Sequence, residues 1–345
     1  MMVTLSVLDQ SPIRKGGTAA QALRESVDLA RACEAAGYKR YWVAEHHSGS
    51  SFAGSAPEIL IGALAAATQT IRVGSAGVML PHYSPLKVAE CFLVLDALYP
   101  GRIDLGVGRA PGSDQRTARA LQPGPQAYGT DVFPQQVELL IQFLEDAQGL
   151  AGEAGGFPAG HPYTGIHAVP RGGQGPAPWM LGSSNDGAVF AAQFGLPFCF
   201  AHFINQDAGT MPMELYRQHF KPSRQSVDDR PLGSIGVSVT VAETEEEAKR
   251  ISASRNLWVL HLLQNRAGPF RPVEEALAYS LSAEEQTMMR GIEQRSIVGT
   301  PAQVRGRLLR LGEEHGVDDF VILTITHDYA DRVKSYRLLA EAFDL

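Results

Sequence analysis

The chain has 345 residues, 44% of them apolar and 19% charged, which is the composition of an ordinary globular protein. A formal net charge of −7 argues against nucleic acid or an anionic membrane surface as a partner. No apolar run reaches the about 18 residues of a membrane span, and the first residues lack the features of a secretory signal, so we expect a cytoplasmic protein.

Short apolar and β-branched runs alternate with amphipathic helical stretches, a pattern typical of repeated βα units. The runs predicted as strands are residues 4–8, 41–44, 71–79, 103–107, 179–181, 197–201, 235–242 and 320–324. The predicted helices are residues 18–36, a stretch that begins near 56, and residues 85–98, 133–146, 185–194, 211–220, 301–315 and 329–343. Eight strands that alternate with helices favour a closed (β/α)8 TIM barrel. A doubly wound open sheet is the alternative, but no Gly-x-Gly-x-x-Gly follows the first strand.

Two segments interrupt this alternation within what we predict to be a single domain, residues 1–345. Residues 149–178 contain nine Gly and five Pro among thirty residues, which indicates a long loop. Long loops in compact domains are usually functional or disordered, so we predict that this one forms a lid over the active site. Residues 256–292 are predicted to be an insertion of extra helices.

The strongest candidate site begins where a predicted strand ends, at Glu45, His46 and His47. In parallel α/β proteins, ligands and chemistry gather at the carboxyl ends of the strands. One imidazole could act as an acid, a base or a hydrogen-bond partner of a bound cofactor. The alternatives are a histidine that only caps the strand end, and a metal site.

A metal site is the weaker alternative, because neighbouring residues of a strand point to opposite sides. Neither His-x-His nor His-Glu-x-x-His occurs in the chain. The cysteines Cys33, Cys91 and Cys199 lie far apart, in no metal-binding spacing. We therefore predict no metal ion and three reduced thiols.

Two further strands carry residues that suit a ligand. Gly108 and Arg109 end the fourth predicted strand, and the guanidinium fork of an arginine suits a phosphate. The alternative is a packing glycine and a surface arginine. In the third predicted strand, the small residues Ala76 and Gly77 indicate that a flat ligand lies against the backbone. A bulge or close strand packing is the alternative.

Gly182, Ser183 and Ser184 lead from the fifth predicted strand into a helix. Hydroxyls and free N–H groups at a helix start form a ready anion site. Simple capping of the helix is the alternative. Because Arg109 lies at the same end of the predicted barrel, these residues together predict a shared phosphate site.

Five segments, in this order, resemble the bacterial-luciferase-like family of flavin-dependent monooxygenases. They are WVAEHH at 42–47, RVGSAGVMLPHYSPLKVAE at 72–90, LYPGRIDLGVGRAPG at 98–112, LGSSNDGAVFAAQFGLP at 181–197 and VGTPAQV at 298–304. The match covers nearly the whole chain. It implies a barrel enzyme that uses reduced FMN, supplied by a separate flavin reductase, and dioxygen to oxidise a small organic substrate. It also implies a homodimer formed through barrel helices near the start of the chain.

Position by position, the resemblance implies roles for the candidate residues. His46 matches the family's active-site histidine near the flavin ring, and Arg109 matches the arginine that binds the flavin phosphate. Ser183 and Ser184 match the segment that also holds this phosphate. The bond between Ala76 and Gly77 falls where the family has a non-prolyl cis peptide beneath the flavin.

The chain departs from the light-emitting members at Gly108, where luciferases carry a reactive cysteine, so we expect no light emission. It resembles more closely the single-chain oxidoreductases of the family. Within this fold, the alternative is a hydride-transfer enzyme with a deazaflavin coenzyme. A non-catalytic flavin-binding protein and a metal-dependent barrel hydrolase are alternatives of other classes. The walls of the substrate pocket are expected from the loops 110–130, 149–178 and 202–212.

Overall fold

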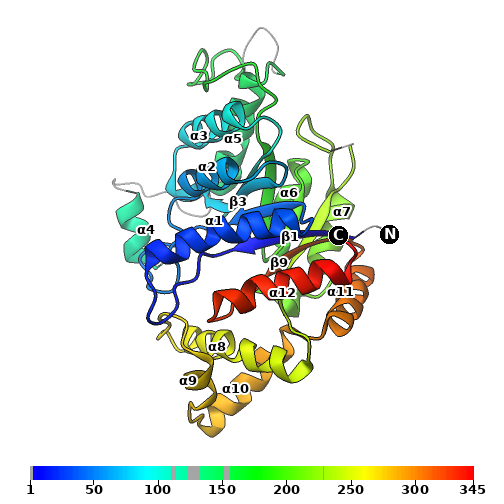
Figure 1. Cartoon of the computed structure of the whole chain (residues 1–345). Coiled ribbons are helices and arrows are strands. Elements are labelled where there is room, and N and C mark those ends of the chain that lie inside the picture. Colours follow the sequence, from blue (N-terminus) through cyan, green and yellow to red (C-terminus); the bar gives the residue numbers. More distant parts are fainter. Residues whose placement is uncertain (1–2, 110–113, 123–131, 151–155, 228) are drawn as a thin grey trace.

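The computed structural model describes residues 3–109, 114–122, 132–150, 156–227 and 229–345. Eight parallel strands close into a barrel, in the order β1-β2-β3-β4-β5-β6-β7-β9, and β9 pairs again with β1 (Figure 1). These strands are β1 (Thr4–Asp9), β2 (Arg40–Val43), β3 (Arg72–Met79), β4 (Ile103–Gly108), β5 (Ala177–Gly182), β6 (Phe198–Phe200), β7 (Gly233–Val241) and β9 (Asp319–Leu323). The predicted (β/α)8 barrel is confirmed.

Helices cover the outside of the barrel (Figure 1). They are α1 (Ala19–Ala35), α2 (Pro57–Ala67), α3 (Pro85–Leu98), α5 (Phe133–Ala147), α6 (Asn185–Gln193), α7 (Met211–His219), α11 (Pro301–His315) and α12 (Tyr329–Ala342). Their bounds agree closely with the predicted ones, and at the starts of α1, α3, α6, α11 and α12 a side chain accepts a hydrogen bond from a free N–H group. At the start of α1, for example, the Thr18 hydroxyl accepts a hydrogen bond from the Gln21 N–H at 3.1 Å. Within the described residues, no helix combines the length and the apolar composition that crossing a membrane requires.

Two short elements were not predicted. Strand β8 (Ile297–Gly299) lies outside the barrel and pairs with the end of β7, from Val239 to Val241. Helix α4 (Gln115–Leu121) follows β4, and the Asp114 carboxylate caps it by accepting from two N–H groups. Both elements are too short to produce a periodic pattern in the sequence.

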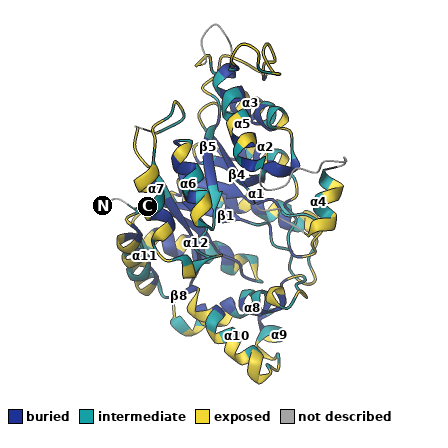
Figure 2. Cartoon of the chain, turned by 180° about the vertical axis from the view of Figure 1, so that it is seen from behind, coloured by how far each residue is buried: buried dark blue, intermediate teal, exposed yellow. Residues whose placement is uncertain are grey.

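Side chains fill the inside of the barrel, so it is a packed core and not a pore. Arg40 donates to Asp319 at 2.7 Å, and its guanidinium lies 4.9 Å from the centre of the Trp179 ring. The Trp42 indole donates to Asp104 at 2.8 Å. Figure 2 shows the strands as the buried centre of the molecule. A second, larger core lies between the strands and the surrounding helices.

The structure corrects the predicted lid. The glycine-rich segment 149–178 leads into the amino end of β5, and its described part lies against α5. Gln148 donates to the carbonyl of Gln174 at 2.6 Å, and His167 lies 2.8 Å from the Asp146 carboxylate. Figure 1 shows the described part of this segment, from residue 156 onward, at the opposite end of the molecule from α8–α10. It therefore cannot cover the carboxyl ends of the strands.

The predicted helical insertion 256–292 is present, but it begins inside a longer helix. Helix α8 (Glu245–Leu263) begins shortly after β7 and is continuous through residue 256. Helices α9 (Val273–Leu277) and α10 (Ala283–Gln294) follow it. These helices form a separate lobe beyond the carboxyl end of β7 (Figure 1). They, and not the glycine-rich segment, lie beside the carboxyl mouth of the barrel.

Candidate active site

Glu45 lies directly after β2 and is fully buried. One carboxylate oxygen lies 2.7 Å from Nε2 of His47 and accepts the Tyr83 hydroxyl at 2.7 Å. The other oxygen accepts the N–H of Met79, the last residue of β3, at 3.0 Å. Burial, followed by the charge of Glu45, raises the pKa of Tyr83 well above its ordinary value, so this hydroxyl remains a donor. Glu45 thus ties the ends of β2 and β3 together and positions its neighbours.

His46 is the next residue, and it places an imidazole at this edge of the barrel. Its backbone N–H donates to the carbonyl of Gly54 at 2.8 Å, and its ring packs against Phe52 with the ring centres 4.5 Å apart. Its buried Nδ1 has no hydrogen-bond partner among the described residues. Burial, and then the neighbouring His47, lower the pKa of His46 to about 4. The imidazole is therefore neutral at pH 7, and its Nδ1 is a buried polar atom without a hydrogen-bond partner in the described chain.

The low pKa of His46 predicts a pH dependence with a definite sign. The ordinary histidine value is 6.5, so the folded protein binds fewer protons than the unfolded chain between pH 6.5 and about 4. We expect stability to fall as the pH is lowered through this window. In a histidine-detected NMR titration, the resonance missing from His46→Gln should shift near pH 4. A midpoint near 6.5 would contradict the buried, neutral imidazole.

The small residues Ala76 and Gly77 lie near the carboxyl end of β3, where this strand packs closely against β4. The peptide bond between Ala76 and Gly77 is cis, as expected there, and the register with β4 shifts between Ala76 and Val78. A Cβ on Gly77 would lie 2.6 Å from the Leu181 side chain and 2.8 Å from the carbonyl oxygen of Gly106. A side chain at this position has no room. The bulge and the close packing foreseen as alternatives are both present, and they leave binding of a flat ligand at this surface as a prediction.

Arg109, at the end of β4, lies beside the start of α6. Its Nη1 is 3.8 Å from the carboxylate of Asp186, and the two side chains are 37% and 71% exposed. The hydroxyl of Ser184 caps the helix, accepting from the Gly187 N–H at 3.3 Å. The carbonyl of Ser183 accepts from the Asn205 amide at 2.8 Å. The structure thus brings the predicted arginine and the predicted helix start together.

Gly108 and Gly182 end the neighbouring strands β4 and β5. Gly108 is buried, and an added Cβ there would meet only the Met79 sulfur, at 3.7 Å. At Gly182, an added Cβ would make ordinary contacts with Phe198 and Gly187. Neither position excludes a side chain, so their proposed contact with a cofactor stays a prediction.

A cavity of about 820 Å³ opens at the carboxyl mouth of the barrel, and His46 lines it. Apolar side chains dominate its walls, including Phe52, Phe203, Trp258, Leu262, Met288 and Ile292. Most of them come from α8 and α10. Of the loops expected to form the walls, the one after β6 contributes and the glycine-rich segment does not, while most of residues 110–130 lie outside the described part.

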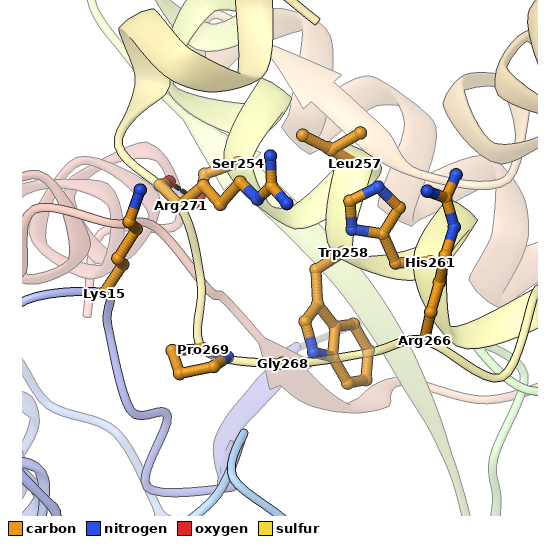
Figure 3. A pocket seen from close by; sticks show the side chains of 9 residues that line it. All are labelled: Lys15, Ser254, Leu257, Trp258, His261, Arg266, Gly268, Pro269 and Arg271. Atoms are coloured by element: carbon orange, nitrogen blue, oxygen red, sulfur yellow. Dashed lines mark hydrogen bonds between the residues drawn. The ribbon is translucent and has the colours of Figure 1, made fainter.

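A second cavity, of about 330 Å³, lies on another side of α8 (Figure 3). Trp258 lines both cavities, and Lys15, His261, Arg266 and Arg271 also line the smaller one. Lys15 and Arg266 are already paired with carboxylates, at 2.7 Å and 2.6 Å. The smaller cavity contains none of the residues predicted for the active site.

The closed barrel and the apolar cavity at its carboxyl mouth define an enzyme of the (β/α)8 class, whose chemistry takes place at the strand ends. The chain belongs to the luciferase-like monooxygenase family, whose model matches residues 3–319. This confirms the resemblance and makes the protein an oxidoreductase of a monooxygenase family.

Relatives match over the whole length. The uncharacterized protein YwcH of Bacillus subtilis is 44% identical over 99% of both chains. N-acetyl-S-alkylcysteine monooxygenase of the same organism is 39% identical over 99% of this chain and 98% of its own. The crystal structure of apo-MsnO8 is 38% identical over 99% of both chains, with a TM-score of 0.86.

More distant structures share the fold and bind different coenzymes. The oxygenating constituent of 3,6-diketocamphane monooxygenase from Pseudomonas putida, in complex with FMN, is 18% identical over 99% of this chain and 97% of its own, with a TM-score of 0.71. An F420-dependent secondary alcohol dehydrogenase is 14% identical over 99% of both chains, with a TM-score of 0.69. At this identity the likeness shows the fold alone.

Proposed function

We propose that this protein is an FMN-dependent monooxygenase that uses reduced FMN and dioxygen to oxidise a small organic substrate. The observation that carries the proposal is the neutral imidazole of His46, whose buried Nδ1 has no partner among the described residues, in the wall of an apolar cavity of about 820 Å³. Such a group can accept or donate one proton in a cavity whose apolar walls exclude much of the water. Membership of the luciferase-like monooxygenase family supports the reaction class.

The residues present fit FMN. Arg109 is a partly exposed cation whose only recorded contact in the described chain is a loose 3.8 Å approach to Asp186, so it can bind a phosphate. Ser183 and Ser184, at the start of α6, would share that phosphate. The backbone at Ala76 and Gly77 would lie against the flat ring.

Reduced FMN, when bound, supplies the electrons that activate dioxygen. His46 would orient the reacting groups through its imidazole and would accept or relay a proton. Because its pKa is about 4, it acts as a neutral imidazole and not as an imidazolium acid. Glu45 would hold this edge rigid through its bonds to β3 and to His47. The apolar walls would keep water away from the reacting atoms.

Arg109→Ala is expected to weaken FMN binding by about 10- to 100-fold, the effect of losing a hydrogen bond to a charged group. Equilibrium dialysis measures it directly. Asp186→Asn is the matched control, because it removes the carboxylate beside the arginine and should leave FMN affinity equal or tighter. Equal affinity in Arg109→Ala and the wild type would refute the phosphate role.

The proposal as a whole is tested by equilibrating the purified protein anaerobically with reduced FMN and, in parallel, with a reduced deazaflavin. Labelled dioxygen is then added with candidate substrates. One relative is named for N-acetyl-S-alkylcysteines, so thioethers of this kind come first. Label in the product would support monooxygenation. Binding of the deazaflavin alone would favour hydride transfer, and tight FMN binding without product would favour a sequestering protein.

We also propose that the protein works with a separate flavin reductase and as a homodimer, in the cytoplasm. On the surface near the start of the chain, Ile59 of α2 is 72% exposed and Leu98 of α3 is 65% exposed. Apolar side chains of this kind suit a helix-to-helix contact between two copies. Sedimentation of the purified protein tests the oligomeric state.

A further inference from the structure

Arg255, on α8, lines the same cavity as His46. Its guanidinium donates to the Ser296 hydroxyl at 2.6 Å and approaches the Asn256 side-chain oxygen at 3.3 Å. Both acceptors are neutral. Among the residues that the structure describes, no carboxylate forms an ion pair with Arg255. Nothing in the sequence distinguishes this residue, because an arginine in a helix usually lies on its solvated face.

The other arginine of the cavity is already neutralised. Arg295 lies 2.8 Å from the carboxylate of Asp207 and is half-exposed. Arg255 has no such partner, and burial alone lowers its pKa to about 10. A guanidinium that is partly withdrawn from water without a counter-charge is costly, and a bound anion would recover part of that cost. The cavity therefore carries one uncompensated positive charge within apolar walls.

We propose that Arg255 receives a single negative charge on the substrate, so that the organic substrates of this enzyme carry a carboxylate or a sulfonate. This inference rests on the proposed function. A guanidinium binds such oxyanions through two parallel hydrogen bonds, which fixes their orientation as well as their presence. The apolar walls contributed by Phe203, Trp258 and Ile292 would hold the uncharged remainder of the molecule, in the same cavity as His46.

The flavin phosphate is a poorer occupant for Arg255. The candidate phosphate residues Arg109, Ser183 and Ser184 lie at the ends of β4 and β5, and none of them lines this cavity. A phosphate also carries close to two negative charges, whereas the cavity offers one unpaired positive charge. The site thus matches a monoanion.

The test measures binding to the full chain without flavin or oxygen, by calorimetry. The probes are benzoate, benzenesulfonate and neutral benzamide, whose ring suits the aromatic walls. We expect at least one of the two anions to bind about 10- to 100-fold more tightly than benzamide. The tighter of the two identifies the head group. Equal binding of all three probes, or binding of none, would overturn the proposal.

Two variants assign the effect to a residue. Arg255→Met should lose the preference for the anion, and Arg255→Lys should retain part of it. Arg271→Met is the matched control, because it removes an exposed arginine from the neighbouring cavity and should preserve the preference. If the control loses the preference and Arg255→Met keeps it, the anion binds in the smaller cavity and the proposal fails.

The outcomes separate this inference from the proposed function. If Arg255→Met does not fold, the affinities of the wild type for benzoate and benzamide still show whether the protein prefers an anion. Loss of anion preference would leave reduced-FMN binding and oxygen incorporation untouched as evidence for a monooxygenase. Failure of FMN binding would leave the anion measurement standing.

Discussion

His46→Ala is expected to form oxygenated product about 10²- to 10⁴-fold more slowly than the wild type, while binding FMN with nearly unchanged affinity. The reason is geometric. His46 lines the cavity with a neutral ring, and its other contacts are a backbone hydrogen bond and the packing of its ring on Phe52. Removing the ring takes away the proton-handling group but not the predicted phosphate site. The measurement is product formed per reduced FMN consumed, beside FMN affinity by dialysis.

His46→Gln separates proton transfer from simple hydrogen bonding. Glutamine has a similar reach and can donate and accept hydrogen bonds, but it does not exchange a proton near neutral pH. If His46 acts as a base, the glutamine variant should be as slow as the alanine variant. Recovery of most of the rate would assign His46 an orienting role, and an unchanged rate in both variants would remove it from the mechanism.

The barrel was predictable from the sequence because each barrel strand is a compact apolar run followed by a helix with a start signal. Thr18 and Ser184 are such signals, and both cap their helices in the structure. Strand β8 was not predicted because its pairing partner lies far away in the sequence, at the end of β7. Pairings of this kind depend on tertiary structure and not on local pattern.

Only part of the site was predictable from the sequence. The predictable residues follow strands, and the others lie on helices. His46 and Arg109 stand immediately after strands, so the parallel topology alone carries them to one edge. The cavity walls come instead from α8 and α10, whose inward-facing side chains cannot be told from packing residues in the sequence. Arg255 is the clearest case, because its function depends on the absence of a nearby carboxylate.

The lid prediction for residues 149–178 was wrong for a reason that the sequence already contained. The segment follows a helix and precedes a strand, and in a parallel barrel every such connection lies at the amino ends of the strands. Glycine and proline content indicates a loop but gives no information about its end of the barrel. The connection after β7, which holds the helical insertion, lies at the carboxyl end and contributes the walls.

Arg332→Met is expected to destabilise the protein by about 3–5 kcal/mol, a large part of the total stability of about 5–15 kcal/mol typical of a domain. Arg332, on α12, donates to the fully buried carboxylate of Asp9 at 2.8 Å and to the carbonyl of Thr324 at 2.8 Å. Tyr41 donates to the same carboxylate at 2.7 Å. The variant leaves a charge buried without its partner. Urea unfolding measures the loss, and Asp9→Asn combined with Arg332→Met should recover part of it.

The pH dependence of this loss distinguishes a buried charge from a simple packing defect. Burial acts to raise the pKa of Asp9, but Arg332, with hydrogen bonds from Ser26 and Tyr41, outweighs it and holds the pKa below the ordinary 3.8. The wild type therefore loses this stability as the pH falls through the folded-state value. Without Arg332, burial prevails and the pKa of Asp9 lies above 3.8, so the variant gains stability as the pH falls. The difference between the two proteins should shrink below about pH 4 if the charge is responsible, whereas a packing defect would keep it constant.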